Sequence, residues 1–338
     1  MSREPSVDVV IPAYRCAGTI GQVLDALLAQ SHLPARIIVV NDASPDSLPD
    51  VLAAYDNRVE VITNEVNLGL AKSYNVGLRR VEAPYAMTLH SDCVLEAGYI
   101  RNLVRILEAT PSAAVATGQY LFADVDRMSF ADRLYLALNL IPREPAEQGV
   151  QPISFIEGKA DLFRLEDLKA VNFFDEHFVL TSEDQDISAR LRARNRKLVQ
   201  DSSSRFTSAF GGTQDTVAKV IRKQRTYARG QAFIALKYGK KAYERTTPNR
   251  NHRAWHRVFQ LFFTALGFAM LVLSMGFPLW LWVWMGWVGV RYLTYLALCL
   301  WVGFRDVWAV SALGVWSDVW YAVGFMEGLI KVTFLGRT

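Results

Sequence analysis

Short apolar segments alternate with amphipathic patterns through the first ninety or so residues. The stretch 18–30 repeats apolar residues every three or four positions, so they fall on one face of a helix. Strands that alternate with helices at this spacing are typical of parallel βαβ units. The pattern therefore predicts an α/β domain with a mostly parallel sheet. The expected strands are 7–11, ended by Pro12, then 36–40, 59–62 and 85–89, and the expected helices are 18–30, 48–55 and 71–81.

Polar or conformationally special residues follow each expected strand. In parallel sheets, ligands bind beyond the carboxyl ends of the strands. The residues that come directly after the four strands should therefore gather along one edge and form the site. They are Pro12, Ala13, Tyr14, Asp42, the loop 64–72 with Lys72, and His90, Ser91 and Asp92.

The C-terminal part of the chain has a membrane-like composition. All nine Trp lie at or after Trp255, and Arg291 is the only charged residue from Val258 to Phe304. This stretch is longer than the roughly 20 residues of one membrane-spanning helix. We expect C-terminal transmembrane helices: a hairpin at 258–276 and 278–304, then a third helix at 307–330 that spans the membrane or lies on it. The predicted domains are 1–212, a basic linker 213–257, and a membrane domain 258–338.

Charged residues near the membrane domain set its expected orientation. An unpaired Arg291 would cost about 2.5–3.5 kcal/mol in the bilayer, so we expect it to pair with protein, lipid phosphate or a lipid-linked substrate. The basic stretch before the hairpin places that side in the cytoplasm. The expected helix 216–236 either lies on anionic lipid or presents a solvated basic face. Its cations are Lys219, Arg222, Lys223, Arg225 and Arg229.

Several functional classes are disfavoured by what the sequence lacks. The net charge of +4 does not indicate nucleic-acid binding. The three cysteines are far apart and form neither a zinc spacing nor a disulfide framework. Neither GxxxxGK[ST] nor GxGxxG follows the first strand, which disfavours an ATPase or a dinucleotide oxidoreductase. The N-terminal residues contain no secretory signal pattern, so we expect the first domain in the cytoplasm.

Five segments in order carry a family resemblance. They are VDVVIPAY, IIVVNDAS, NLGLAKSYNVGL, LHSDC and TSEDQDISARL, and together they span about residues 7–190. Their order and spacing resemble family 2 glycosyltransferases, which have the nucleotide-sugar-binding GT-A fold. The resemblance implies transfer from a nucleotide-diphosphate sugar by a single in-line displacement with inversion at the anomeric carbon.

The resemblance also assigns roles to the residues after the strands. Asp42 would contact the nucleobase, although a turn former is equally expected in DASPD. Lys72 would meet the diphosphate at a helix start, unless it is a solvated lysine. Asp92 would hold a divalent cation, Mg²⁺ or Mn²⁺, that bridges to the substrate phosphates. The family usually has two acids here, and His90 stands in place of the first. Asn75 is expected to pack.

An acidic segment, Ser182 to Asp186, precedes a helix expected at 187–195. By resemblance Asp184 is the general base that takes the proton of the acceptor hydroxyl. Glu183 and Asp186 are expected to position the loop; acids at a helix start also complement the helix dipole. Glu157 and Asp161 are secondary candidates beside Gly158, whose lack of a side chain permits close approach. The segment 124–151 is expected to be an irregular insertion that could form an acceptor loop.

The sequence thus predicts a membrane-anchored inverting glycosyltransferase with a cytoplasmic catalytic domain and a multi-pass anchor in the cell membrane. Its partners would be a nucleotide-diphosphate sugar, a lipid-linked or membrane-proximal acceptor, and membrane lipids. One alternative is a polysaccharide synthase with a membrane channel, weakened because QRTY departs from the Gln/Arg-rich motif of such enzymes. Another is a catalytically silent sugar-nucleotide-binding protein. All these roles require Asp92 and Asp184 to meet in one cleft.

Overall fold

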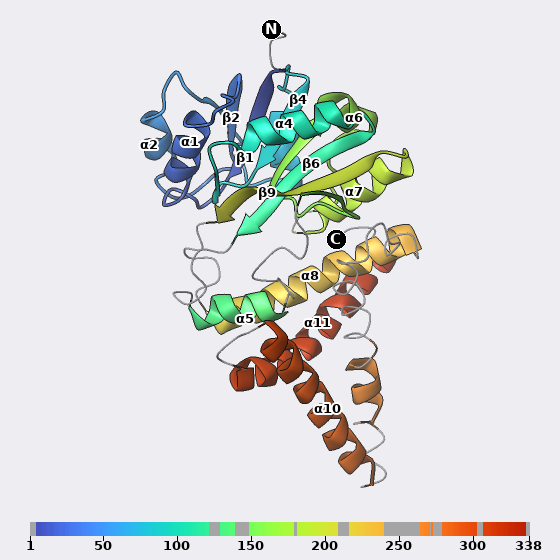
Figure 1. Ribbon diagram of the computed structural model, residues 1–338. Helices are drawn as coiled ribbons and strands as arrows, with labels where there is room; N and C mark the ends of the chain where they lie inside the picture. Colours follow the sequence, from blue (N-terminus) through green and yellow to red (C-terminus); the bar gives the residue numbers. More distant parts are fainter. Residues whose placement is uncertain are drawn as a thin grey trace. The chain divides into compact units, whose positions relative to one another are not determined.

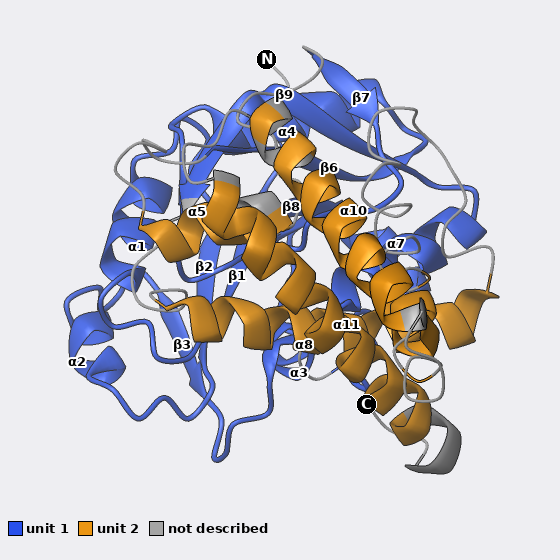
Figure 2. Cartoon of the chain, turned by 90° about the horizontal axis from the view of Figure 1, so that it is seen from below, with its two compact units in different colours: residues 1–123, 145–209, 244–247 blue, residues 124–144, 210–243, 248–338 orange. Residues whose placement is uncertain are grey.

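The computed structural model describes residues 5–121, 129–138, 149–178, 181–208, 216–239, 262, 264–270, 272, 279–302 and 307–335. The chain forms two compact units that interleave along the sequence (Figure 2). Unit 1 comprises Met1–Ala123, Pro145–Ala209 and Glu244–Thr247, and unit 2 comprises Asp124–Glu144, Phe210–Tyr243 and Pro248–Thr338. The segment 124–151, expected to be irregular, contains a helix in unit 2 and a short strand in unit 1.

Unit 1 is built on a nine-stranded sheet with helices packed against it (Figure 1). The strand order is β3-β2-β1-β4-β8-β6-β9-β5, and β7 pairs with β9. The strands are β1 Val7–Ala13, β2 Arg36–Asn41, β3 Glu60–Thr63, β4 Tyr85–Leu89, β5 Cys93–Leu95, β6 Ala113–Leu121, β7 Val150–Pro152, β8 Ala160–Arg164 and β9 Lys197–Ser208.

The sheet is mixed, which corrects the expectation of a mostly parallel one. The four strands β1 to β4 are parallel, as predicted, but β8 runs antiparallel between β4 and β6. A buried strand has the same hydrophobic pattern whether it runs parallel or antiparallel to its neighbours, so the sequence pattern does not predict the direction of β8. The first strand also continues past Pro12 to Ala13. Its pairing with β4 ends at Val10–Thr88, so Pro12 lies beyond that ladder and pairs in register only with β2.

The helices of unit 1 place their apolar faces on the sheet. On one face, Val10 and Ile38 of the sheet share a core with Tyr74, Phe163 and Ile187. Gly77 permits this packing, because a Cβ there would lie 2.3 Å from a methyl group of Val10. The helices are α1 Ile20–Leu28, α2 Leu48–Ala53, α3 Leu70–Leu78, α4 Tyr99–Ala109, α6 Leu165–Ala170 and α7 Glu183–Ala193.

Unit 2 is helical in its described part, with α5 Phe130–Leu138, α8 Val217–Tyr238, α10 Leu279–Val302 and α11 Val307–Leu335. The two acidic residues of α11, Asp318 and Glu327, lie nine positions apart and therefore on opposite faces of the helix. Asp318 accepts hydrogen bonds from Arg291 and from Tyr295 of α10. Glu327 instead binds Arg225 and Arg229 of α8. The partner of Arg291, which the sequence left open, is therefore a protein carboxylate.

Among the described residues, one helical stretch, Trp308–Lys331 in α11, is long and apolar enough to cross a membrane. Large apolar side chains on it, including Trp308, Trp316 and Met326, are exposed. The predicted third helix is thus the strongest candidate span. Most of the expected first span, 258–276, lies outside the described residues. Two of the five cations of α8 are engaged by Glu327, so that helix does not present all its charge to solvent or lipid.

Candidate active site

Asp42 follows β2 and is buried, with 3% of its surface exposed. Its Oδ1 accepts hydrogen bonds from the Leu68 amide at 2.7 Å and from the Asn64 side chain at 2.8 Å. Its Oδ2 accepts one from the Gly69 amide at 3.0 Å. Asp42 therefore holds the loop that precedes α3. Among the residues that the structure describes, Gly69 is the one donor to Oδ2, and a carboxylate oxygen accepts two hydrogen bonds, so a second acceptor position is left on it.

The turn between β4 and β5 carries the predicted metal ligand. The Asp92 side chain is 38% exposed, and its Oδ1 lies 4.0 Å from His90 Nδ1. The His90 backbone amide donates to the Lys159 carbonyl at 2.8 Å, and the Ser91 carbonyl accepts from the Thr19 hydroxyl at 2.9 Å. Both backbone contacts fix the turn at the end of β4. Asp92 is accessible to a ligand there.

The remaining predicted donor contacts lie near the ends of β1 and α3. Pro12 and Ala13 belong to β1, with Ala13 buried, and Tyr14 follows with 42% of its surface exposed. Lys72 lies in the first turn of α3, which begins at Leu70 and ends at Leu78, three residues before the expected end. Burial raises the pKa of Glu176, but the side-chain hydrogen bonds that Asn75 and Arg79 donate to this carboxylate lower it by more. The charge of Lys72 makes a smaller contribution in the same direction.

The acidic segment forms the first turn of α7, which begins at Glu183 rather than at the expected residue 187. Ser182 precedes it in a left-handed conformation, with φ of 74°. Gly158 also has positive φ, and a Cβ there would lie 3.0 Å from the Asp184 Cβ. Only a residue without a side chain allows the loop before β8 to approach Asp184 this closely. The expectation for Gly158 is confirmed in this respect.

Burial perturbs the acids at the start of α7. Burial raises the pKa of Glu183 to about 7. Burial, together with the charges of Glu183 and Glu157, raises the pKa of Asp184 well above its usual value. The Gln185 amide donates to Asp184 Oδ1 at 2.8 Å and opposes part of this rise. A carboxylate with a raised pKa is a stronger proton acceptor, as a general base requires.

Asp186 forms an ion pair within α7. Its buried carboxylate accepts from Arg190 Nε at 2.7 Å. The same guanidinium donates to the carbonyls of Val171 and Phe173, and so fixes the turn before the acidic segment. Asp186 is thus linked to this turn through Arg190.

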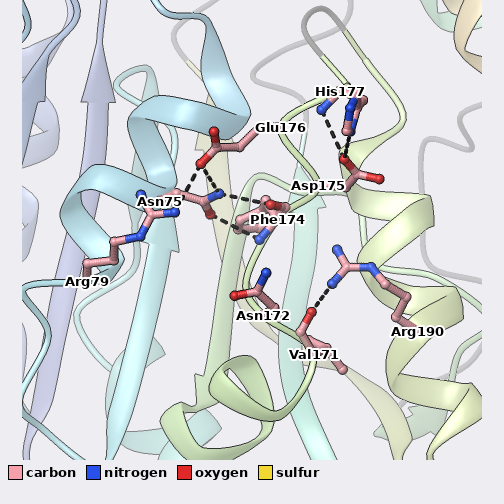
Figure 3. A pocket seen from close by; sticks show the side chains of 9 residues that line it. All are labelled: Asn75, Arg79, Val171, Asn172, Phe174, Asp175, Glu176, His177 and Arg190. Carbon is pink, nitrogen blue, oxygen red and sulfur yellow. Dashed lines mark hydrogen bonds and ion pairs between the residues drawn. The ribbon is translucent and has the colours of Figure 1, made fainter. Parts of the chain in front are cut away.

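A pocket of about 430 Å³ lies beside this turn, between α3 and α7 (Figure 3). The Asn75 side chain donates a hydrogen bond to the Phe174 carbonyl and accepts one from the Phe174 amide. These contacts stabilise one wall of the pocket and agree with the packing role expected for Asn75. The pocket also contains ion pairs of Arg79 with Glu176 and of His177 with Asp175. Because Arg79 follows the C-terminal end of α3, this pocket lies away from the strand ends and is not part of the candidate site.

Tyr74, which the sequence did not single out, and Asp161, a secondary candidate, are both buried. Tyr74 is buried and its ring stacks on His90 at 6.4 Å and on Phe174 at 5.3 Å between centroids. Burial raises the pKa of its hydroxyl well above the usual value, with smaller contributions from the charges of Asp161, Glu183 and Asp92. Asp161 is fully buried in β8. Its one sequence signal was an acid inside the apolar run ADLFR.

The side chains at the site determine how a divalent cation could bind there. Among the described residues there is no group of three His, Cys, Asp or Glu side chains that could hold a metal. Mg²⁺ and Mn²⁺ are often bound by one or two carboxylates together with substrate phosphates and water. The exposed carboxylate of Asp92 fits that arrangement, with the other ligands coming from the substrate and solvent.

Comparisons with known proteins agree with this architecture. A mannosyltransferase from Pyrobaculum calidifontis, solved with GDP-Man and Mn²⁺, has a similar fold, with a TM-score of 0.61 and 15% identity over 96% of this chain and 88% of that one. An uncharacterized glycosyltransferase from Haemophilus influenzae is 29% identical over 38% of this chain and 40% of its own length. The succinoglycan biosynthesis protein ExoO of Rhizobium meliloti is 29% identical over 32% of each chain.

The chain covers less than half the length of these curated relatives. The model of glycosyl transferase family 2 matches residues 8–201, more than half of the chain. This range holds every predicted site residue and ends inside β9. The resemblance in the sequence segments is thereby confirmed, and the chain belongs to glycosyl transferase family 2.

Proposed function

We propose that this chain is a membrane-anchored inverting glycosyltransferase. It moves one sugar from a nucleotide-diphosphate sugar to the hydroxyl of a lipid-linked or membrane-proximal acceptor. The observation that carries the proposal is the first turn of α7, where Asp184 is held against Gly158 among acids whose pKa values are raised. Such a carboxylate is suited to remove a proton from an alcohol.

Different residues bind the donor, hold the cation and accept the proton in this reaction. Pro12, Ala13 and Tyr14 line the donor pocket with the Asp42 loop, and Lys72 faces the diphosphate with the first amides of α3. Asp92 would hold a divalent cation, which would offset the charge that develops on the diphosphate leaving group. Asp184 accepts the acceptor's proton as the hydroxyl oxygen attacks the anomeric carbon. The turn fixed by Asp186 and Arg190 keeps this base in place.

Membrane attachment is supported by α11 and its exposed apolar side chains. A span in the same chain keeps the catalytic unit near the bilayer, which favours acceptors that are lipid-linked or lie at the membrane surface. The basic residues that precede the apolar region favour a cytoplasmic catalytic unit by the positive-inside rule.

The test is sugar transfer by the full chain purified in detergent. Thermal stability is first screened with UDP-, GDP- and dTDP-sugars and with Mg²⁺ or Mn²⁺, because a ligand that binds the folded state raises the unfolding temperature. Transfer by the stabilising donor to membrane lipid extracts then follows, with product length and anomeric configuration measured. Long products would support a polymer synthase instead. Donor binding without transfer or hydrolysis would overturn the catalytic proposal.

A further inference from the structure

Helices α5 and α8 of unit 2 lie side by side (Figure 1), and a lysine of α8 lies over two aromatic rings. The Lys223 ammonium is 4.9 Å from the centre of the Tyr135 ring of α5 and 5.7 Å from that of Tyr227, one turn farther along α8. The hydroxyls of the two tyrosines are 2.9 Å apart and share a hydrogen bond. The contact between the two helices therefore fixes the position of this cation.

The charge of Lys223 is not balanced within the described part of the chain. The side chain is half-buried, and among the residues that the structure describes no carboxylate pairs with its ammonium. Asp132, the acid of α5, accepts a hydrogen bond from the Ser129 hydroxyl at 2.6 Å at the start of that helix. Aromatic rings supply only part of the stabilisation that a partly desolvated ammonium loses when it leaves water. An anion that binds beside Lys223 would supply the rest.

The surroundings of Lys223 on α8 are also positively charged. Lys219 lies one turn before Lys223, Arg222 precedes it directly, and α8 contains neither Asp nor Glu. Cations in the first two turns oppose the helix dipole, so helix stability does not explain them. The two arginines farther along α8 are already bound to Glu327 of α11. The first two turns of α8 thus present a set of cations that suits an anionic partner.

We propose that Lys223, held by Tyr135 and Tyr227, is a binding site for the phosphate of an anionic phospholipid headgroup. Lys223 supplies the charge, and the paired tyrosines fix it in place. Anionic lipids attract basic segments at the membrane surface, and tyrosine and lysine side chains are typical of that boundary. The inference rests on the membrane attachment in the proposed function, but not on sugar transfer.

The test is lipid binding by the full chain in a neutral detergent, titrated with a short-chain phosphatidylglycerol. The unfolding midpoint, followed by Trp fluorescence, should rise with the lipid, because a ligand of the folded state stabilises it. Lys223→Met should weaken this binding about fivefold, which is the contribution of one basic residue near an anionic lipid surface. Lys223→Arg keeps the charge and should keep most of the binding. Unchanged binding in Lys223→Met would overturn the proposal.

Lys237→Met is the matched control. Lys237 also lies over aromatic rings, those of Phe233 and Tyr238, but in the last turn of α8. This variant should bind the lipid as the wild type does, and an equal loss in both variants would show diffuse attraction to a basic helix in place of a site. Phosphatidylcholine of the same chain length, whose headgroup has no net charge, should bind more weakly. Equal stabilisation by phosphatidylcholine or by inorganic phosphate would also overturn the proposal.

Two measurements on the wild type keep the test independent of how the variants fold. Added NaCl should weaken the binding of phosphatidylglycerol, because salt screens the attraction between charges, and binding that does not change with salt would overturn the proposal. Partition of the full chain into a phase-separating detergent tests membrane attachment separately. A chain that stays in the aqueous phase yet binds phosphatidylglycerol at Lys223 would support this site and refute the proposed anchor.

Discussion

Replacing Asp318 with Asn tests the buried ion pair of unit 2. Asp318 is fully buried and Arg291 is 3% exposed, and two hydrogen bonds of 2.9 and 2.7 Å join them. The Tyr295 hydroxyl donates to the second Asp318 oxygen at 2.6 Å. The variant keeps the size of the side chain and removes its charge, which leaves the Arg291 cation uncompensated. Breaking a buried pair in this way costs about 3–5 kcal/mol.

Glu327→Gln is the matched control on the same helix. Glu327 and its partners Arg225 and Arg229 are 28–32% exposed. Solvent screens such pairs, and each is worth about 0–1 kcal/mol. Both variants break contacts between helices. We nevertheless expect Asp318→Asn to lower the free energy of unfolding more than Glu327→Gln does.

The assay is thermal unfolding of the full chain in detergent, followed by Trp fluorescence. All nine Trp lie at or after Trp255, so the signal reports on unit 2. At about 2–4 °C per kcal/mol, Asp318→Asn should lower the midpoint by roughly 6–20 °C and Glu327→Gln by no more than about 8 °C for its two pairs. The double variant Arg291→Met with Asp318→Leu should recover most of the loss. Equal losses in both single variants, or no recovery, would refute the reasoning.

Four further outcomes are expected. Asp184→Asn should reduce transfer by about 10²–10⁴-fold while the protein stays folded, as thermal unfolding would show; full turnover would exclude this residue as the base. Gly158→Ala, which forces a side chain into positive φ beside Asp184, should cost about 1–2 kcal/mol and lower activity, and an unaffected enzyme would contradict the close approach. Asp92→Asn should weaken activation by Mn²⁺, measured by titrating the metal against transfer, whereas an unchanged titration would place the cation elsewhere. Because burial raises the pKa of Asp161 to about 8 from 3.8, the folded state binds this proton more tightly. The contribution of this group to stability should therefore be largest below about pH 4 and be lost as pH rises toward 8, by at most about 5–6 kcal/mol, so the stability of Asp161→Asn relative to the wild type should rise over that range in thermal melts.

The predicted donor residues illustrate what local sequence can establish. The alternation of strand and helix patterns located β1 to β4, because burial of one helix face and of whole parallel strands leaves a periodic signature. The polar residues after those strands followed from the rule that such strands end at one edge. Asp42 follows β2, as the sequence indicated. Its three hydrogen bonds come from residues 64–69, and no local pattern in the sequence predicts them.

The sequence alone determined the family, the parallel half of the sheet and the position of the acidic turn. Local periodicity and short motifs carry that information within a few residues. Only the tertiary structure decided the direction of β8, the protein partner of Arg291, and the burial of Asp161 and Tyr74. Each of these depends on contacts between segments far apart in the chain, and the desolvation that gives a buried acid its chemistry arises only when those segments pack together.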